Sequence, residues 1–382
     1  MGAEQYGIFS LLIAIFTIAV QISDFGISTS YVKYVSENLS KVREIFFTIV
    51  VGKIIFSIIV MVCLYILSGY ISQFFFETMK YQHIIMFIGV GVLFHSMLGV
   101  VISHYQAIQH FKRMAYANIA HNTLRFLAIV VIALLFTESE HMEYFIYGYL
   151  YSAAVILLYI IVKNISTLSL NYTFELKHFQ EIYKLGFWIF LSSFAVMIFL
   201  RLDIIMLQKL SSSSEVGYYS AAMNLAMIFP LITSSLTATL LPKMNNFLQT
   251  NSIKKYIFFI LKKGIYVLPF LLFVELISSL LILLLFGKAY TDSIHVFQVL
   301  ILTYGIGIIV NPISLVFYSI KRAYILTIQN WMQLFLNYFG NILLIPLYQA
   351  EGAAVSTLIV NVFGGLFTTY YLLNMKDVKD IG

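Results

Sequence analysis

The sequence predicts an all-α protein that crosses a lipid bilayer many times. Hydrophobic residues make up 61% of the 382 residues, charged residues only 10%, and the mean hydropathy is +0.92. A soluble domain has about 25% charged residues, so this chain cannot cover its surface with charge in water. Long apolar segments without period-two alternation indicate helices and not barrel strands. The composition therefore argues against a soluble enzyme or a nucleic-acid-binding protein.

Eleven segments are apolar enough over the length of about 20 residues that a bilayer crossing requires. The predicted spans are 7–33, 43–69, 82–107, 114–136, 143–163, 183–208, 216–240, 262–286, 293–319, 323–346 and 353–374. Because the linkers between them are short, neighbouring spans should pack as antiparallel hairpins.

The basic residues outside the spans predict the orientation. Seventeen Lys and Arg residues fall on one set of alternate loops, and only Lys80, Lys209 and Lys288 fall on the other set. Positively charged loops face the cytoplasm, so the C-terminus is predicted to be cytoplasmic and Met1 to lie outside. Residues 2–7 are typical of a loop between helices. We therefore expect a twelfth helix to precede residue 1.

Short sequence matches 208 to 210 residues apart predict an internal duplication. The matched residues are Gly7 and Gly217, Tyr116 and Tyr324, and Asn122 and Asn330. Matched spans run in the same direction, which predicts two parallel helical lobes with a substrate site between them near the bilayer midplane. We expect the lobes at 1–163 and 183–382, joined by a cytoplasmic linker at 164–182.

Four motifs carry a resemblance to a known family. They are Gly2–Ser10, Asp24–Ile27, Leu202-Asp203 followed by Glu215–Ala222, and Ala350–Ala354. Together they resemble the polysaccharide-transporter, or O-antigen-flippase-like (Wzx-type), family of the multidrug/oligosaccharidyl-lipid/polysaccharide exporter superfamily. The resemblance implies twelve helices in two six-helix lobes with both termini inside. It also implies translocation of a lipid-linked oligosaccharide across the bacterial cytoplasmic membrane.

Ionisable residues inside the spans are candidates for function, because each costs about 2.5–3.5 kcal/mol to insert. There are six of them: Asp24, Lys53, Arg125, Arg201, Asp203 and Glu275. Asp24 and Lys53 should lie at equal depth on adjacent helices. They form either a structural ion pair or a proton or cation site in which Lys53 gates Asp24.

Arg125 lies near the middle of its span, with His95 and Ser96 at matching depth on the previous helix and no acid there. A guanidinium binds phosphate oxygens in a bidentate fork, which suits a diphosphate ligand. The alternative is a structural arginine that is hydrogen-bonded within the protein.

The remaining candidates are assigned by depth and chemistry. Arg201 and Asp203 are two residues apart and cannot face each other; Arg201 is a further substrate-binding cation or extends to the interface. Asp203 and Glu275, with Asp24, are candidate ion-coupling acids, although Glu275 could instead be a protonated acid hydrogen-bonded to Tyr304. Asn122 and Asn330, matched by the repeat, are substrate-binding candidates, with interhelical hydrogen bonding as the alternative. No metal or cofactor motif is found, and Cys63 is the single cysteine.

The leading hypothesis is a flippase that moves a polyprenyl-diphosphate-linked oligosaccharide from the inner to the outer leaflet by alternating access, for surface polysaccharide synthesis. Expected partners are H⁺ or Na⁺ as the coupling ion, the bilayer, and the polysaccharide polymerase machinery. Within the same superfamily, a multidrug/cation antiporter or a peptidoglycan-precursor flippase remains open. A membrane glycosyltransferase or polymerase is less favoured, because no nucleophile, metal or phosphate-loop motif is present.

Overall fold

The computed structural model describes residues 2–37, 42–136, 141–164, 175–250, 253–320 and 322–375, and these residues form helices and short connections with no strand among them. The contacts divide the chain into two compact units. Unit 1 is Leu11–Met197, and unit 2 is Gly2–Ser10 together with Ile198–Gly382. The predicted all-α, multi-span fold is confirmed.

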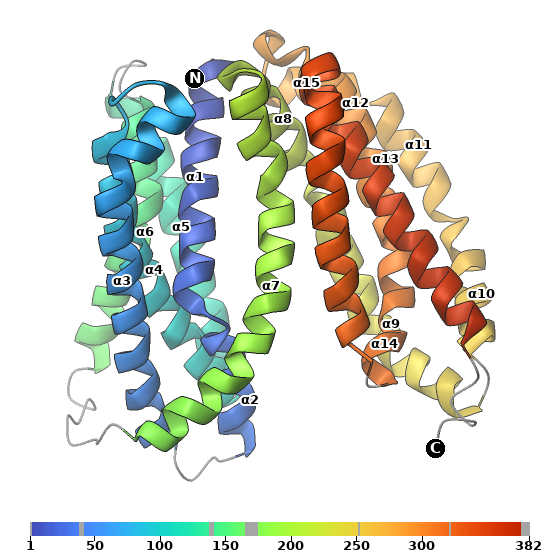
Figure 1. The fold of residues 1–382 in the computed structure, drawn as a ribbon, viewed down its shortest axis with the longest axis horizontal. Helices are drawn as coiled ribbons and strands as arrows, with labels where there is room; N and C mark the ends of the chain where they lie inside the picture. Colours follow the sequence, from blue (N-terminus) through green and yellow to red (C-terminus); the bar gives the residue numbers. More distant parts are fainter. Residues whose placement is uncertain are drawn as a thin grey trace. The chain divides into compact units, whose positions relative to one another are not determined.

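Unit 1 is a bundle built around one central helix (Figure 1). Its helices are α1 (Ala3–Asp24) from Leu11 onward, α2 (Ile27–Glu37), α3 (Val42–Phe76), α4 (Gln82–Ala107), α5 (Phe111–Leu135), α6 (His141–Asn164) and the first part of α7 (Leu176–Leu210). Helix α4 packs against α2, α3, α5 and α6. Its buried positions therefore meet side chains from most of the unit.

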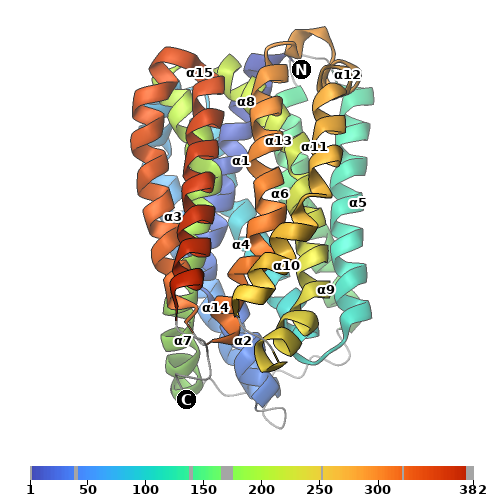
Figure 2. The same cartoon turned by 90° about the vertical axis from the view of Figure 1, so that its right-hand side faces the viewer.

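Unit 2 has a similar plan, with α13 as its central helix (Figure 2). Its helices are the rest of α7, then α8 (Ser213–Ala226), α9 (Ile228–Thr250), α10 (Ile253–Gly264), α11 (Val267–Leu276), α12 (Ser278–Leu285), α13 (Ser293–Ser314), α14 (Val316–Ser319) and α15 (Tyr324–Asn374). Helix α13 packs against α8, α9, α10, α11, α12 and α15.

Helix α15 is a hairpin of two membrane-length legs. Its 51 residues bend at Gln349, where φ is 52°. The amide of Gln333 donates to the carbonyl oxygen of Val360 at 3.2 Å, and the amide of Gln329 donates to that of Gly364 at 3.1 Å. Moving four residues forward on the first leg, from Gln329 to Gln333, moves the contact four residues backward on the second leg, from Gly364 to Val360, as in an antiparallel pair. With nine further apolar helices among the described residues, the two legs complete the eleven predicted spans.

The first predicted span is interrupted by a sharp break at the Asp24–Ile27 motif. Phe25 has φ of 48° and Gly26 has φ of 70°. These two residues, in left-handed backbone conformations, connect the end of α1 to the start of α2. A Cβ atom at Gly26 would lie 2.2 Å from the carbonyl oxygen of Gly186 on α7. Glycine is needed here both for the backbone angle and for the close approach of the two helices.

Helix extends into two of the predicted connections between spans. The connection between the predicted spans 216–240 and 262–286 is helical in its described residues, because α9 continues to Thr250 and α10 begins at Ile253. Helix α10 buries Tyr256, Ile257 and Ile260 and places its lysines elsewhere on its surface, an amphipathic pattern that a search for continuous apolarity misses. The predicted linker at 164–182 is likewise helical from Leu176, and unit 1 extends into α7 as far as Met197. Residues 165–174 of that linker lie outside the described residues.

The two repeat-matched glycines lie against each other in unit 2. A Cβ atom added to Gly7 would lie 1.7 Å from the carbonyl oxygen of Ser213, and one added to Gly217 would lie 2.0 Å from that of Ala3. Ser213 is four residues before Gly217, and Ala3 is four residues before Gly7. The contact is therefore reciprocal, as a local two-fold axis would make it.

Replacing either glycine of this contact should destabilise the protein. We expect Gly7→Ala and Gly217→Ala each to lower the melting temperature and folded yield in detergent, because the methyl group has no room without separating the helices. Gly99→Ala is the matched control: nothing lies within 4 Å of its added Cβ, and alanine is about 0.5–1 kcal/mol better than glycine within a helix. Unchanged melting of Gly7→Ala and Gly217→Ala would contradict the observed packing.

Candidate functional site

Asp24 and Lys53 form a buried ion pair in unit 1. The ammonium group of Lys53 on α3 donates to Oδ1 of Asp24 at the end of α1, and the Lys53 residue is only 1% exposed. The hydroxyl of Ser28 donates to the same oxygen at 2.5 Å. The pairing predicted from equal depth is confirmed.

Arg125 belongs to a cluster of rings in the middle of unit 1. Its guanidinium carbon lies 3.9 Å from the centre of the Tyr149 ring of α6, a cation–π contact. The rings of His95 and His121 lie 5.1 Å apart, and the charge of Arg125 interacts with both histidines. The predicted proximity to His95 is therefore confirmed.

The hydrogen-bonding capacity of Arg125 is only partly used. Its Nε and Nη2 atoms are buried and have no hydrogen-bond partner among the described residues. The ion pairs within those residues join Lys53 to Asp24, His83 to Glu143 and His178 to Glu175, so none of them includes Arg125. A buried guanidinium with unused donors is costly unless an anion or water reaches it.

Asp203 lies at the centre of a polar network in unit 2. It is 4% exposed, and its Oδ1 accepts a hydrogen bond from the Asn341 amide at 2.7 Å. Its Oδ2 accepts one from the Thr357 hydroxyl at 2.7 Å and another from the Tyr219 hydroxyl. Asn337 extends the network by donating to Thr357 at 3.0 Å. Each of these donors is a neutral side chain, so hydrogen bonds rather than a counter-charge stabilise the carboxylate.

Tyr304 lies near Asp203 and Arg201, not near Glu275 as expected. Electrostatic interactions link the Tyr304 hydroxyl to both Asp203 and Arg201, and Arg201 is half-buried. Glu275 ends the short helix α11, and its Oε2 is buried without a hydrogen-bond partner among the described residues. The predicted Glu275–Tyr304 hydrogen bond is wrong. The prediction matched the two residues by counting along one continuous helix, whereas the structure has a break at Ile277 after α11.

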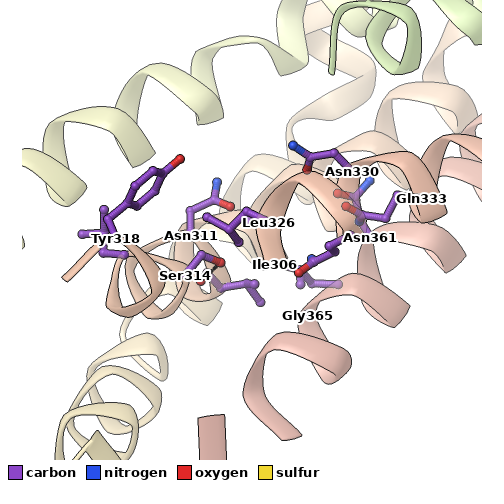
Figure 3. A pocket seen from close by; sticks show the side chains of 13 residues that line it. Ile306, Asn311, Ser314, Tyr318, Leu326, Asn330, Gln333, Asn361 and Gly365 are labelled. Atoms are coloured by element: carbon purple, nitrogen blue, oxygen red, sulfur yellow. Dashed lines mark hydrogen bonds between the residues drawn. The ribbon is translucent and has the colours of Figure 1, made fainter. Parts of the chain in front are cut away.

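The two repeat-matched asparagines have different surroundings in their own units. Asn122 is exposed on α5. Asn330 is half-buried and lines a cavity of about 280 Å³ in unit 2, together with Asn311, Gln333 and Asn361. Figure 3 shows these amides around the cavity. Neither asparagine touches a charged candidate residue in an observed hydrogen bond.

Sequence analysis missed two groups of polar residues. One group is the set of hydrogen-bond donors to Asp203, which are Tyr219 and two residues on the legs of α15. Asn341, on the first leg, is more than 130 residues after Asp203 in the sequence. The other group is Glu44, Glu175 and His178, whose ligand atoms lie within 4.8 Å of one another and have the chemistry to hold a metal ion. Glu44 lies in the first turn of α3, whereas Glu175 directly precedes α7, so their distance in the sequence conceals the group.

A membrane bundle with buried charges of both signs and a polar cavity is typical of a transporter. Comparison with known families identifies which one. The family model for polysaccharide biosynthesis proteins matches residues 1–248, and the chain belongs to that family. It is 21% identical over 315 residues to a protein of Escherichia coli (strain K12) named provisionally as an O-antigen transporter, covering 78% of this chain and 72% of that protein.

Two solved structures share the fold. One is the lipid II flippase MurJ in an inward closed conformation, with a TM-score of 0.78 and 16% identity over 100% of this chain and 83% of that one. The other is an inward-facing multidrug resistance transporter of the MATE family, with a TM-score of 0.74 and 14% identity over 97% of this chain and 91% of that one. The chain therefore has the multi-pass, all-helical membrane fold of these two transporters.

The buried pair of unit 1 leads to a direct prediction. Asp24→Asn and Lys53→Met should each destabilise the protein by about 3–5 kcal/mol, because each leaves one charge buried without its partner. The double variant should be clearly milder than the sum of the two. Unfolding of the four proteins in detergent measures this coupling, and strictly additive losses would contradict a contact between the charges.

Proposed function

We propose that this protein translocates a polyprenyl-diphosphate-linked oligosaccharide from the inner to the outer leaflet of the bacterial cytoplasmic membrane by alternating access. The observation that carries the proposal is the half-buried guanidinium of Arg125, whose buried nitrogens are incompletely bonded. Two of its nitrogens have no hydrogen-bond partner among the described residues, and no observed ion pair neutralises it. A diphosphate supplies the missing oxygens and the missing charge.

The family of the chain supports this choice of ligand. Two proteins that share the fold are named as a lipid II flippase and as a multidrug resistance transporter. An organic cation needs an acidic partner, whereas the ring cluster around Arg125 consists of Tyr149, His95 and His121. Charge therefore favours an anionic headgroup in unit 1. The protein is proposed to bind and move this lipid without breaking or making its covalent bonds.

Asp203 is the proposed coupling site for H⁺ or Na⁺. Burial with only neutral donors raises the free energy of the charged carboxylate, which a bound proton or cation would relieve. The Oδ1 atom of Asn341 is buried next to it and accepts no hydrogen bond from the described residues, so it offers a second oxygen to a cation. Asp24 has Lys53 as its counter-charge already, and its part in coupling is the weaker proposal.

Arg125→Ala should lower transport at least about a hundredfold, because two charge-assisted hydrogen bonds of about 1.5–3 kcal/mol each are lost. Arg125→Lys keeps the charge but not the fork and should retain part of the activity. Purified protein in sealed vesicles, supplied with labelled lipid-linked oligosaccharide, provides the measurement. Arg113→Ala is the control, since Arg113 is an exposed arginine on the same helix. Normal transport per folded molecule of Arg125→Ala would remove Arg125 from the site.

Asp203→Asn should uncouple transport from the ion gradient. A tenfold gradient stores about 1.4 kcal/mol per ion, enough for about tenfold accumulation of substrate in one leaflet. We expect the variant to equilibrate the substrate between leaflets but not to accumulate it, under either a proton or a sodium gradient. Glu351→Gln, at an exposed acid on α15, is the control. Accumulation by Asp203→Asn equal to that of the unmodified protein would exclude Asp203 as the coupling group.

A further inference from the structure

The amide-lined cavity of unit 2 has no role in the interactions described so far. Its walls come from α13 and the short connection after it, and from both legs of α15 (Figure 3). The polar lining residues are Asn311, Ser314, Tyr318, Gln329, Asn330, Gln333 and Asn361, and the described part of the chain contributes no Asp, Glu, Lys, Arg or His to the lining. The cavity is therefore strongly polar but uncharged.

Several of the amides are held in fixed orientations by the bundle. The Gln333 amide nitrogen donates to Val360 O at 3.2 Å, and the Asn361 amide nitrogen donates to Thr357 O at 2.8 Å. One N–H of each amide is engaged in this way, so each side chain presents its oxygen as an acceptor and keeps its second N–H as a donor. The side chains of Asn311 and Asn330 make no hydrogen bond within the described residues, so each offers a donor and an acceptor.

We propose that this cavity is a subsite for one uncharged sugar residue of the transported lipid-linked oligosaccharide. Every sugar hydroxyl both donates and accepts hydrogen bonds, which matches a lining of amides that offer both a donor and an acceptor, two of them held in fixed orientations. A diphosphate needs cations and an organic cation needs an acid, and the lining holds neither. An acidic sugar would likewise lack a counter-charge here.

Size and surroundings agree with a single sugar ring. The volume of about 280 Å³ equals roughly nine water molecules at ~30 Å³ each, and lies at the lower limit of ~300 Å³ for small-molecule pockets. Tyr318, which is 61% exposed, adds an aromatic ring to the lining. Such a ring packs against the apolar face of a sugar while its hydroxyl stays hydrated.

The position along the membrane normal also fits loading from the cytoplasm. Asn330 is six residues after the start of α15, about 9 Å along the helix axis from the end that carries Arg322. The charge pattern of the loops predicts that this end is cytoplasmic. The subsite rests on the proposed function, in which the lipid-linked sugar is taken up from the inner leaflet.

The test compares two probes on the full-length protein in detergent. One is a short-chain polyprenyl diphosphate that carries a single uncharged hexose or N-acetylhexosamine, and the other is the bare polyprenyl diphosphate. We expect at least one sugar of the panel to tighten binding about tenfold over the bare lipid, and a glucuronic acid not to do so. Asn330→Leu combined with Asn361→Leu should remove that gain and leave the Kd of the bare lipid unchanged.

Control variants separate this proposal from the broader one. Asn118→Leu is the matched control. The amide of Asn118 donates to a carbonyl oxygen four residues earlier, as the amide of Asn361 does, but it lies on α5 in unit 1. The sugar-dependent gain in binding should therefore persist in this variant. Arg125→Ala should weaken both probes equally and preserve their ratio. If the unmodified protein binds neither probe, the proposed function fails. If it binds both equally, or if the folded double variant keeps the gain, the cavity holds only water and the subsite is refuted.

Discussion

The structure depends on one constraint: a polar side chain inside an apolar bundle must find its partner within the protein or in a ligand, because lipid supplies none. Lys53 satisfies this constraint with Asp24, and Asp203 satisfies it with neutral donors from α8 and α15. Arg125 and the cavity amides do so incompletely. For these groups, the missing hydrogen-bond partner has to come from water or from a bound ligand.

The two units meet this constraint with different chemistry. Unit 1 places ionised or ring-bearing groups in its interior, with Lys53 and Arg125 as buried cations. Unit 2 relies on amides and hydroxyls, both around Asp203 and in the cavity at Asn330. In the proposed function, the diphosphate suits the cationic interior of unit 1, and an uncharged sugar suits the amide-lined cavity of unit 2.

Sequence reasoning succeeded where the contact was local. Asp24 and Lys53 lie on neighbouring helices joined by a short loop, so counting residues from that loop places them level, and the proximity of Arg125 to His95 follows from the same count. It failed for the hydrogen bond between Glu275 and Tyr304, because α11 and α12 are two helices where the sequence predicts one. The partners of Asp203 could not be predicted, since Asn341 and Thr357 lie far along the chain and depth alone does not select a face of a helix. The amphipathic α10 was missed because its lysines interrupt the apolarity that defined a span.

The bend at Gln349 has a consequence for how the protein reaches the membrane. Gln329, Gln333 and Asn337 of the first leg find acceptors in the second leg, on the carbonyl oxygens of Gly364 and Val360 and the hydroxyl of Thr357. The two legs can therefore satisfy most of each other's amides before the rest of unit 2 is in place. During synthesis, the two legs would then enter the bilayer together as one hairpin, and not as two separate helices with unpaired amides. The 51 residues of α15 thus form a unit of membrane insertion that conceals its own amides from lipid as it enters.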